Sequence, residues 1–130
     1  MPLRMLIVDD ERDVSEFLGE IASDAGYEVV TANCAKDFKA AFAATRADVI
    51  LLDLTLPDTD GIELLKYMAE IGTRARILIV SGYDETIRLM AYEIGAARGL
   101  DRAGVLAKPL NMPDFEGLLD QFKRDAGQLN

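Results

Sequence analysis

The chain has 130 residues, half of them apolar, and a formal net charge of −9 at pH 7. This length fits one domain with a single hydrophobic core, and the single cysteine, Cys34, excludes an intrachain disulfide. The absence of histidine excludes Ser–His hydrolases and zinc–histidine sites, and the acidic balance disfavours nucleic-acid binding, which needs clustered Lys and Arg.

The acidic charge is concentrated in the first half of the chain. Residues 1–61 carry 13 acids against 5 bases, whereas residues 62–130 carry 10 against 9. The acidic half could attract a cation or a basic partner, although plain solubility explains most of the charge. No apolar run approaches the roughly 20 residues that span a bilayer, and the start of the chain lacks the features of a signal peptide. We therefore expect a cytoplasmic protein that does not contact the membrane.

Five apolar runs alternate along the chain with five segments of helical periodicity. The runs occupy residues 5–8, 29–31, 49–52, 77–80 and 105–106. The first, third and fourth are almost continuously apolar, which is typical of strands buried on both faces. This alternation predicts one doubly wound α/β domain over residues 1–130, with a parallel sheet, helices on both faces and no output domain.

The helical segments place an apolar residue every three or four positions. The first includes Val14, Leu18 and Ile21 and ends at Gly26, a helix stop, while the last begins near Pro113, which a first helical turn tolerates. The phenylalanines are expected in the core; they are Phe17, Phe38, Phe42, Phe115 and Phe122.

Polar residues follow four of the five predicted strands. Asp9 and Asp10 follow the first, Asp53 the third, Ser81 the fourth and Lys108 the fifth. In open α/β sheets, ligands bind at the carboxyl ends of the strands, so these side chains should converge at one edge. Clustered carboxylates raise one another's pKa, and a hard cation such as Mg²⁺, which prefers oxygen ligands, would relieve the repulsion.

The same residues suit phosphoryl transfer. Lys108 can bind one phosphoryl oxygen, Ser81 can bond another, and a carboxylate can act as the nucleophile and form an aspartyl phosphate. Structural alternatives remain at this stage. Asp9 and Asp10 could cap the helix that follows, and Asp53 could form a turn. Glu11 is placed at the start of that helix, and Asp58 and Asp60 are interpreted as solvated turn residues.

Four motifs occur in order: LIVDDE at 6–11, DLTLPDTDG at 53–61, SGY at 81–83 and KP at 108–109. With them, the chain resembles the receiver domain of two-component response regulators over essentially its whole length. The resemblance implies a flavodoxin-like fold with strand order 2-1-3-4-5. It also implies a signalling switch that accepts a phosphoryl group on Asp53 from a histidine kinase or a histidine phosphotransfer protein.

The resemblance also implies roles for the other residues. Asp9, Asp10, Asp53 and the backbone carbonyl of Thr55 would hold Mg²⁺, while Lys108 and Ser81 would engage the phosphoryl group. Thr55 and Tyr83 would tune the phosphate lifetime, and the peptide bond before Pro109 would be cis. Such a domain is not an enzyme in the ordinary sense. It catalyses its own phosphoryl acceptance and dephosphorylation, and it signals to an output partner through the face formed by the fourth helix, fifth strand and fifth helix.

One residue departs from the family pattern. Val105 stands three positions before Lys108, where the family often has an aromatic switch residue. Val105 counts slightly for a second hypothesis, a constitutive interaction module that keeps the fold without using phosphate, whereas the intact Asp10, Asp53, Ser81 and Lys108 count against it. An aspartyl phosphatase is disfavoured, because Thr55 stands where such enzymes usually carry a second acid.

Overall fold

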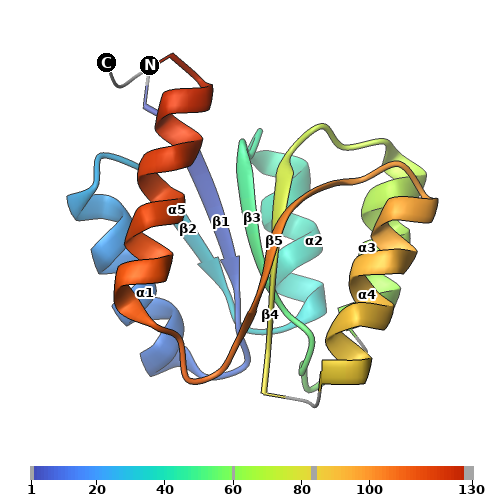
Figure 1. Ribbon diagram of the computed structural model, residues 1–130. Helices are drawn as coiled ribbons and strands as arrows, with labels where there is room; N and C mark the ends of the chain where they lie inside the picture. The colour runs from blue at the N-terminus through green and yellow to red at the C-terminus, as the bar shows by residue number, and fades with distance from the viewer. Residues whose placement is uncertain (1, 60, 83–84, 128–130) are drawn as a thin grey trace.

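The computed structural model describes residues 2–59, 61–82 and 85–127. Strands and helices alternate through this part of the chain, as Figure 1 shows. The strands are β1 (Arg4–Val8), β2 (Glu28–Ala32), β3 (Val49–Asp53), β4 (Arg76–Ser81) and β5 (Asp101–Ala107). The helices are α1 (Arg12–Asp24), α2 (Ala35–Ala44), α3 (Gly61–Ile71), α4 (Glu85–Ala97) and α5 (Met112–Asp125).

The strands form one parallel sheet in the order β2-β1-β3-β4-β5. Helices α1 and α5 cover one face of the sheet, and α2, α3 and α4 cover the other (Figure 1). The predicted doubly wound architecture and strand order are therefore confirmed. Strand β2 lies on one side of β1, whereas β3, β4 and β5 follow one another on the other side. The direction of strand order therefore reverses at β1, and the topological switch point lies between β1 and β3. Among the described helices, none has the length and apolar character needed to cross a membrane.

The sheet separates two apolar cores. Successive residues of a strand point to opposite faces, so Leu6 and Val8 of β1 pack on the α2–α3–α4 side, while Met5 and Ile7 pack on the α1–α5 side. Residues of β3 and β4 alternate in the same way. Because both faces are covered, every residue of β3 is buried. This double burial explains the continuous apolar runs in the sequence.

The prediction that all five phenylalanines lie in the core is wrong for Phe17, which is 52% exposed. The buried residues of α1 are Ser15, Leu18, Gly19 and Ala22. A polar residue and a glycine therefore belong to the buried face of α1, and the apolar Phe17 lies beside that face. Phe42 is only partly buried and packs against the core formed with α2, α3 and α4, whereas the other three are buried.

Strand β5 begins several residues before the predicted run at 105–106. It pairs with β4 from Asp101 onward, with an irregularity in register between Ile77 and Leu78. The apolar pattern did not reveal its first half, DRAG, because these residues are polar or small. Helix α4 and this longer strand therefore occupy most of the chain between Ser81 and Lys108.

Gly61 begins α3 at a place with no room for a side chain. Its amide donates to the carbonyl of Leu54 at 3.1 Å. A Cβ atom added at this position would lie 2.5 Å from the Leu54 Cα atom. Because Leu54 directly follows Asp53, this close approach fixes the start of α3 against the end of β3.

We expect Gly61→Ala to lower the free energy of unfolding by about 1–3 kcal/mol, because the backbone of Leu54 must move to admit a methyl group. Urea denaturation monitored by circular dichroism measures this change. Gly117→Ala is the matched control: a Cβ at that position in α5 meets nothing within 4 Å. Removing this helical glycine should raise stability by about 0.5–1 kcal/mol. Equal stability of Gly61→Ala and the wild type would contradict the packing described here.

Candidate functional site

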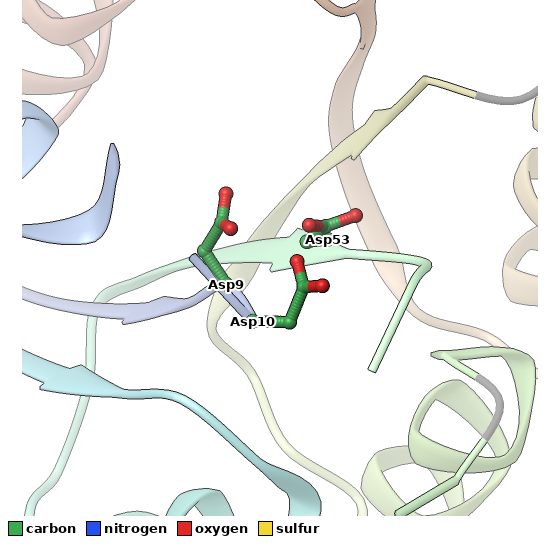
Figure 2. A group of neighbouring side chains, drawn as sticks. All are labelled: Asp9, Asp10 and Asp53. Atoms are coloured by element: carbon green, nitrogen blue, oxygen red, sulfur yellow. The ribbon is translucent and has the colours of Figure 1, made fainter. Parts of the chain in front are cut away.

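Three carboxylates lie together at the carboxyl ends of β1 and β3. Asp9 and Asp10 directly follow β1, and Asp53 is the last residue of β3, the neighbouring parallel strand. One ligand oxygen from each lies within 4.8 Å of those of the other two, and Figure 2 shows the three side chains gathered at this edge of the sheet. Asp9 and Asp53 are buried, whereas Asp10 is exposed.

Lys108, which follows β5, joins the two buried acids. Its Nζ atom lies 2.7 Å from Asp53 Oδ2 and 3.0 Å from Asp9 Oδ2. Its backbone amide donates to the carbonyl of Ser81 at 3.0 Å, and its peptide bond to Pro109 is cis. Two buried negative charges therefore share the positive charge of this lysine.

The pKa values follow from this arrangement. Burial raises the pKa of Asp53 to about 6, while the hydrogen bonds from Lys108 and from the Thr55 amide partly oppose the increase. Burial also acts to lower the pKa of Lys108, but its contacts with Asp53 and Asp9 outweigh that effect and raise the pKa above its ordinary value. Lys108 thus stays charged, and the carboxylate of Asp53 is the group whose ionisation the fold opposes.

Asp9 is held by backbone contacts. Its Oδ1 atom accepts from the Glu11 amide at 2.9 Å, its carbonyl accepts from Asn33 Nδ2 at 2.9 Å, and its amide donates to the carbonyl of Ala32. The N-cap residue of α1 is Glu11, and its side chain makes no capping hydrogen bond. Neither Asp9 nor Asp10 is therefore the N-cap residue of α1, although Asp9 accepts a hydrogen bond from the amide of Glu11, which is.

The site has the donor set of a hard divalent cation. Among the described residues, Asp9 Oδ2 is a buried oxygen that accepts no hydrogen bond, although Lys108 Nζ lies close to it. Its contact is with an ammonium group that Asp53 also engages, so the two buried carboxylates share one positive charge. All three neighbouring side chains offer carboxylate oxygens, which suit Mg²⁺ or Ca²⁺ and not a soft metal. The residues present therefore fit a cation of this class.

The remaining predicted site residues differ in how the structure places them. Ser81 is buried at the end of β4, one position beyond Val80, which pairs with Asp53 in the adjacent strand. The amide of Thr55 donates to Asp53 Oδ1 at 3.0 Å. Tyr83 lies outside the described residues. Val105 is partly buried in β5, pairs with Ile79 and packs against the core on the α2–α3–α4 side.

Asp58 is exposed in the loop after β3, as the sequence suggested, but it also contacts a distant helix. Its carboxylate accepts from the amides of Ala35 at 2.7 Å and Lys36 at 3.1 Å, at the start of α2. Sequence reasoning missed this contact because an acid in a loop does not reveal which distant helix it meets. Asp60, which was interpreted in the same way, lies outside the described residues.

A groove beside the acidic site also escaped sequence reasoning. It is lined by apolar residues of α1 and of the segment after β5, among them Val14, Phe17, Leu110 and Met112. Glu11 and Lys108 line it as well. The exposed ring of Phe17 thus lies beside the segment that carries Lys108. The sequence contains Phe17 on a predicted helix, but the groove was missed because every phenylalanine was expected to lie in the core.

Fold and site together define a flavodoxin-like α/β domain with an acid–lysine site at the switch point of its sheet. The family model for the response regulator receiver domain matches residues 5–120, and the chain belongs to this family. The chain is 35% identical to the sporulation initiation phosphotransferase F of Bacillus subtilis, over 92% of each chain. A receiver domain from Methanospirillum hungatei aligns with a TM-score of 0.77 at 26% identity, covering 96% of this chain and 99% of that one.

Some relatives are longer proteins. The response regulator MprA of Mycolicibacterium vanbaalenii is 33% identical over 88% of this chain, and the chain spans 48% of that relative's length. The similarity therefore concerns the receiver portion of such proteins.

In the metal-free protein, we expect Asp53→Asn to raise the free energy of unfolding at pH 7.5 by about 1–3 kcal/mol. Burial opposes ionisation of Asp53, so removing its charge leaves one buried carboxylate paired with one lysine. Urea denaturation in the presence of a chelator measures the difference. A variant that is less stable than the wild type would show that the Asp53–Lys108 contact outweighs the cost of burying the charge.

Proposed function

We propose that this domain is a phosphorylation-operated signalling switch that accepts a phosphoryl group on Asp53 in a Mg²⁺-dependent reaction. The observation that carries the proposal is the position of Asp53. It is a buried carboxylate at the sheet's switch point, with other acids on one side and the ammonium group of Lys108 in contact. Membership of the receiver family supports the same role.

The proposed reaction moves a phosphoryl group between two protein side chains. A carboxylate oxygen of Asp53 attacks the phosphorus of a partner's phosphohistidine, a new P–O bond forms, and the P–N bond breaks as the imidazole leaves. Lys108, already 2.7 Å from Asp53 Oδ2, would pair with a phosphoryl oxygen. Ser81, at the end of the neighbouring strand, would supply a hydroxyl. Hydrolysis of the aspartyl phosphate, with Thr55 and Tyr83 tuning its rate, would reset the switch.

The cation would be held by Asp9, Asp10 and Asp53, with the backbone carbonyl of Thr55 as a further ligand. Bound Mg²⁺ supplies positive charge that neutralises the acids and the incoming phosphoryl oxygens. The three carboxylates gathered at this edge of the sheet, two of which share the charge of Lys108, support this assignment.

Phosphorylation would change the affinity of the α4–β5–α5 face for an output partner. Leu89 and Met90 of α4 are 52% and 49% exposed, and these apolar side chains would be available to a protein partner. Val105 offers no aromatic ring, so the movement of Ser81 would carry the signal. Val105 is also the observation that favours the second candidate, a constitutive interaction module.

The phosphodonor would be a histidine kinase or a histidine phosphotransfer protein. The groove that contains Phe17 lies beside Lys108 and would receive an apolar part of that partner. The exposed Phe17 supports docking of a protein surface, since a small phosphodonor needs no apolar contact outside the site.

We expect the wild type to gain one phosphoryl group from acetyl phosphate when Mg²⁺ is present, and none when a chelator replaces it. Asp53→Asn should gain none in either condition, because the attacking carboxylate is missing. Intact-protein mass spectrometry measures both results.

Two negative outcomes have different meanings. If the wild type binds Mg²⁺ but gains no phosphoryl group, small donors are not substrates, and phosphorylated histidine kinases must be tested. If it neither gains the group nor binds Mg²⁺, the switch is refuted and the constitutive interaction module is favoured.

We expect Phe17→Ala to slow transfer from a phosphohistidine donor protein by about 30-fold, because truncating a buried aromatic anchor in an interface typically costs about 2 kcal/mol. The donor is chosen by its transfer to the wild type. Uptake from acetyl phosphate should change by less than about twofold, since that donor makes no contact in the groove. Val30→Ala, which removes an exposed apolar side chain of β2, is the matched control. Equal transfer to both variants would reject docking in the groove and leave the role of Asp53 intact.

A further inference from the structure

Residues 33–36 are the loop between β2 and α2 together with the first two residues of α2, and they contact two loops of the site. One is the loop after β1, which carries Asp9 and Asp10, and the other is the loop after β3, which follows Asp53. Asn33 Nδ2 donates to the carbonyl of Asp9 at 2.9 Å and to Ser15 Oγ at 3.1 Å. On the other side, the amides of Ala35 and Lys36 donate to the carboxylate of Asp58. The loop after β1 and the loop after β3 are therefore linked through this segment, as well as through Lys108.

Asp58 acts on α2 as an N-terminal capping acid that comes from another part of the chain. The first amides of a helix have no partner within the helix, and its N-terminus favours negative charge. Each oxygen of Asp58 accepts from one of these amides, at 2.7 Å and 3.1 Å. The hydrogen bond from the Ala35 amide holds the pKa of Asp58 below its ordinary value, so the carboxylate is ionised at neutral pH.

The loop after β3 is fixed at both ends as well as at Asp58. The amide of Leu54 donates to the carbonyl of Val80 at 3.1 Å, and the amide of Gly61 donates to the carbonyl of Leu54 at 3.1 Å. Thr55 lies within this loop, between Leu54 and Asp58. Its amide bonds Asp53, and its carbonyl is the proposed fourth oxygen of the cation site. The link from Asp58 to α2 is thus a restraint on the part of the loop that follows Thr55.

We propose that Asp58 is a positioning residue for the cation site, which it serves by fixing the Thr55 segment to α2 and, through Asn33, to the Asp9 loop. Asp58 itself does not touch the cation. The inference rests on the proposed function, because it assumes that these loops bind Mg²⁺. Partners that orient metal ligands typically change metal affinity by 10–100-fold when they are removed.

Three variants separate positioning from simple charge. Asp58→Ala removes the acceptor and the charge, whereas Asp58→Asn removes the charge but keeps one acceptor oxygen for α2. Asp37→Ala removes an exposed acid from the first turn of the same helix, and it controls for a change of net charge near α2. Isothermal titration calorimetry with Mg²⁺ is performed at 25 °C on metal-free protein that circular dichroism shows to be folded.

We expect Asp58→Ala to weaken Mg²⁺ binding by about tenfold, and Asp58→Asn and Asp37→Ala to stay within about threefold of the wild type. The Mg²⁺ concentration that gives half-maximal uptake from acetyl phosphate should rise in parallel for Asp58→Ala. The rate at saturating Mg²⁺ should change far less, a split that a general loss of stability would not produce.

Two results would overturn the inference while the proposed function stands. In one, Asp58→Ala binds Mg²⁺ as the wild type does. In the other, Asp58→Asn is as impaired as Asp58→Ala, which would assign the effect to charge alone. A wild type that binds no Mg²⁺ would instead refute the proposed function and this inference together.

Discussion

Two buried carboxylates compete for one ammonium group at the edge of this sheet, and the rest of the site is arranged around that imbalance. Asp9 and Asp53 both contact Lys108 Nζ, and the exposed Asp10 adds a third acid nearby. Burying like charges is costly unless other charges compensate. The local structure therefore retains an excess of negative charge, which a divalent cation or the positive groups around a phosphoryl transfer would relieve. A site of this kind is unfavourable for folding alone.

The fold tolerates the free-energy cost of burying these like charges because the apolar cores on both faces of the sheet fix the strand ends. Asp53 lies at the end of β3, every residue of which is buried, and Asp9 follows the equally apolar end of β1. Lys108 reaches them from β5, while its amide is bonded to the carbonyl of Ser81 at the end of β4. The ends of four strands thus fix the backbone positions from which the charged groups meet. The apolar packing supplies the rigidity that the acidic site needs.

The sheet and the position of the site could be predicted from the sequence, whereas features that depend on the direction of individual side chains could not. Continuous apolar runs followed by Asp9, Asp53, Ser81 and Lys108 were sufficient to predict the sheet and the edge where those residues lie. The burial of Ser15 and Gly19 could not be predicted, because neither has a large apolar side chain. The buried face of α1 was therefore misplaced, and the exposure of Phe17 was missed. Asp58 was missed for another reason. Its partners are two backbone amides of a helix more than twenty residues earlier in the chain, and backbone groups leave no mark in a sequence pattern.

Although Val105 lacks the aromatic ring often found at this position in the family, another contact links Asp53 to β4. Lys108 joins Asp53 to β4 through two bonds of different kinds: its ammonium group binds the carboxylate of Asp53, and its amide binds the carbonyl of Ser81. Under the proposed function, a phosphoryl group on Asp53 would interact with both that ammonium group and the Ser81 hydroxyl. Both interactions would act at the end of β4, from which the chain continues to α4 with its exposed Leu89 and Met90. A signal that follows this route needs no ring at position 105, so a switch built on Ser81 and Lys108 is compatible with valine there.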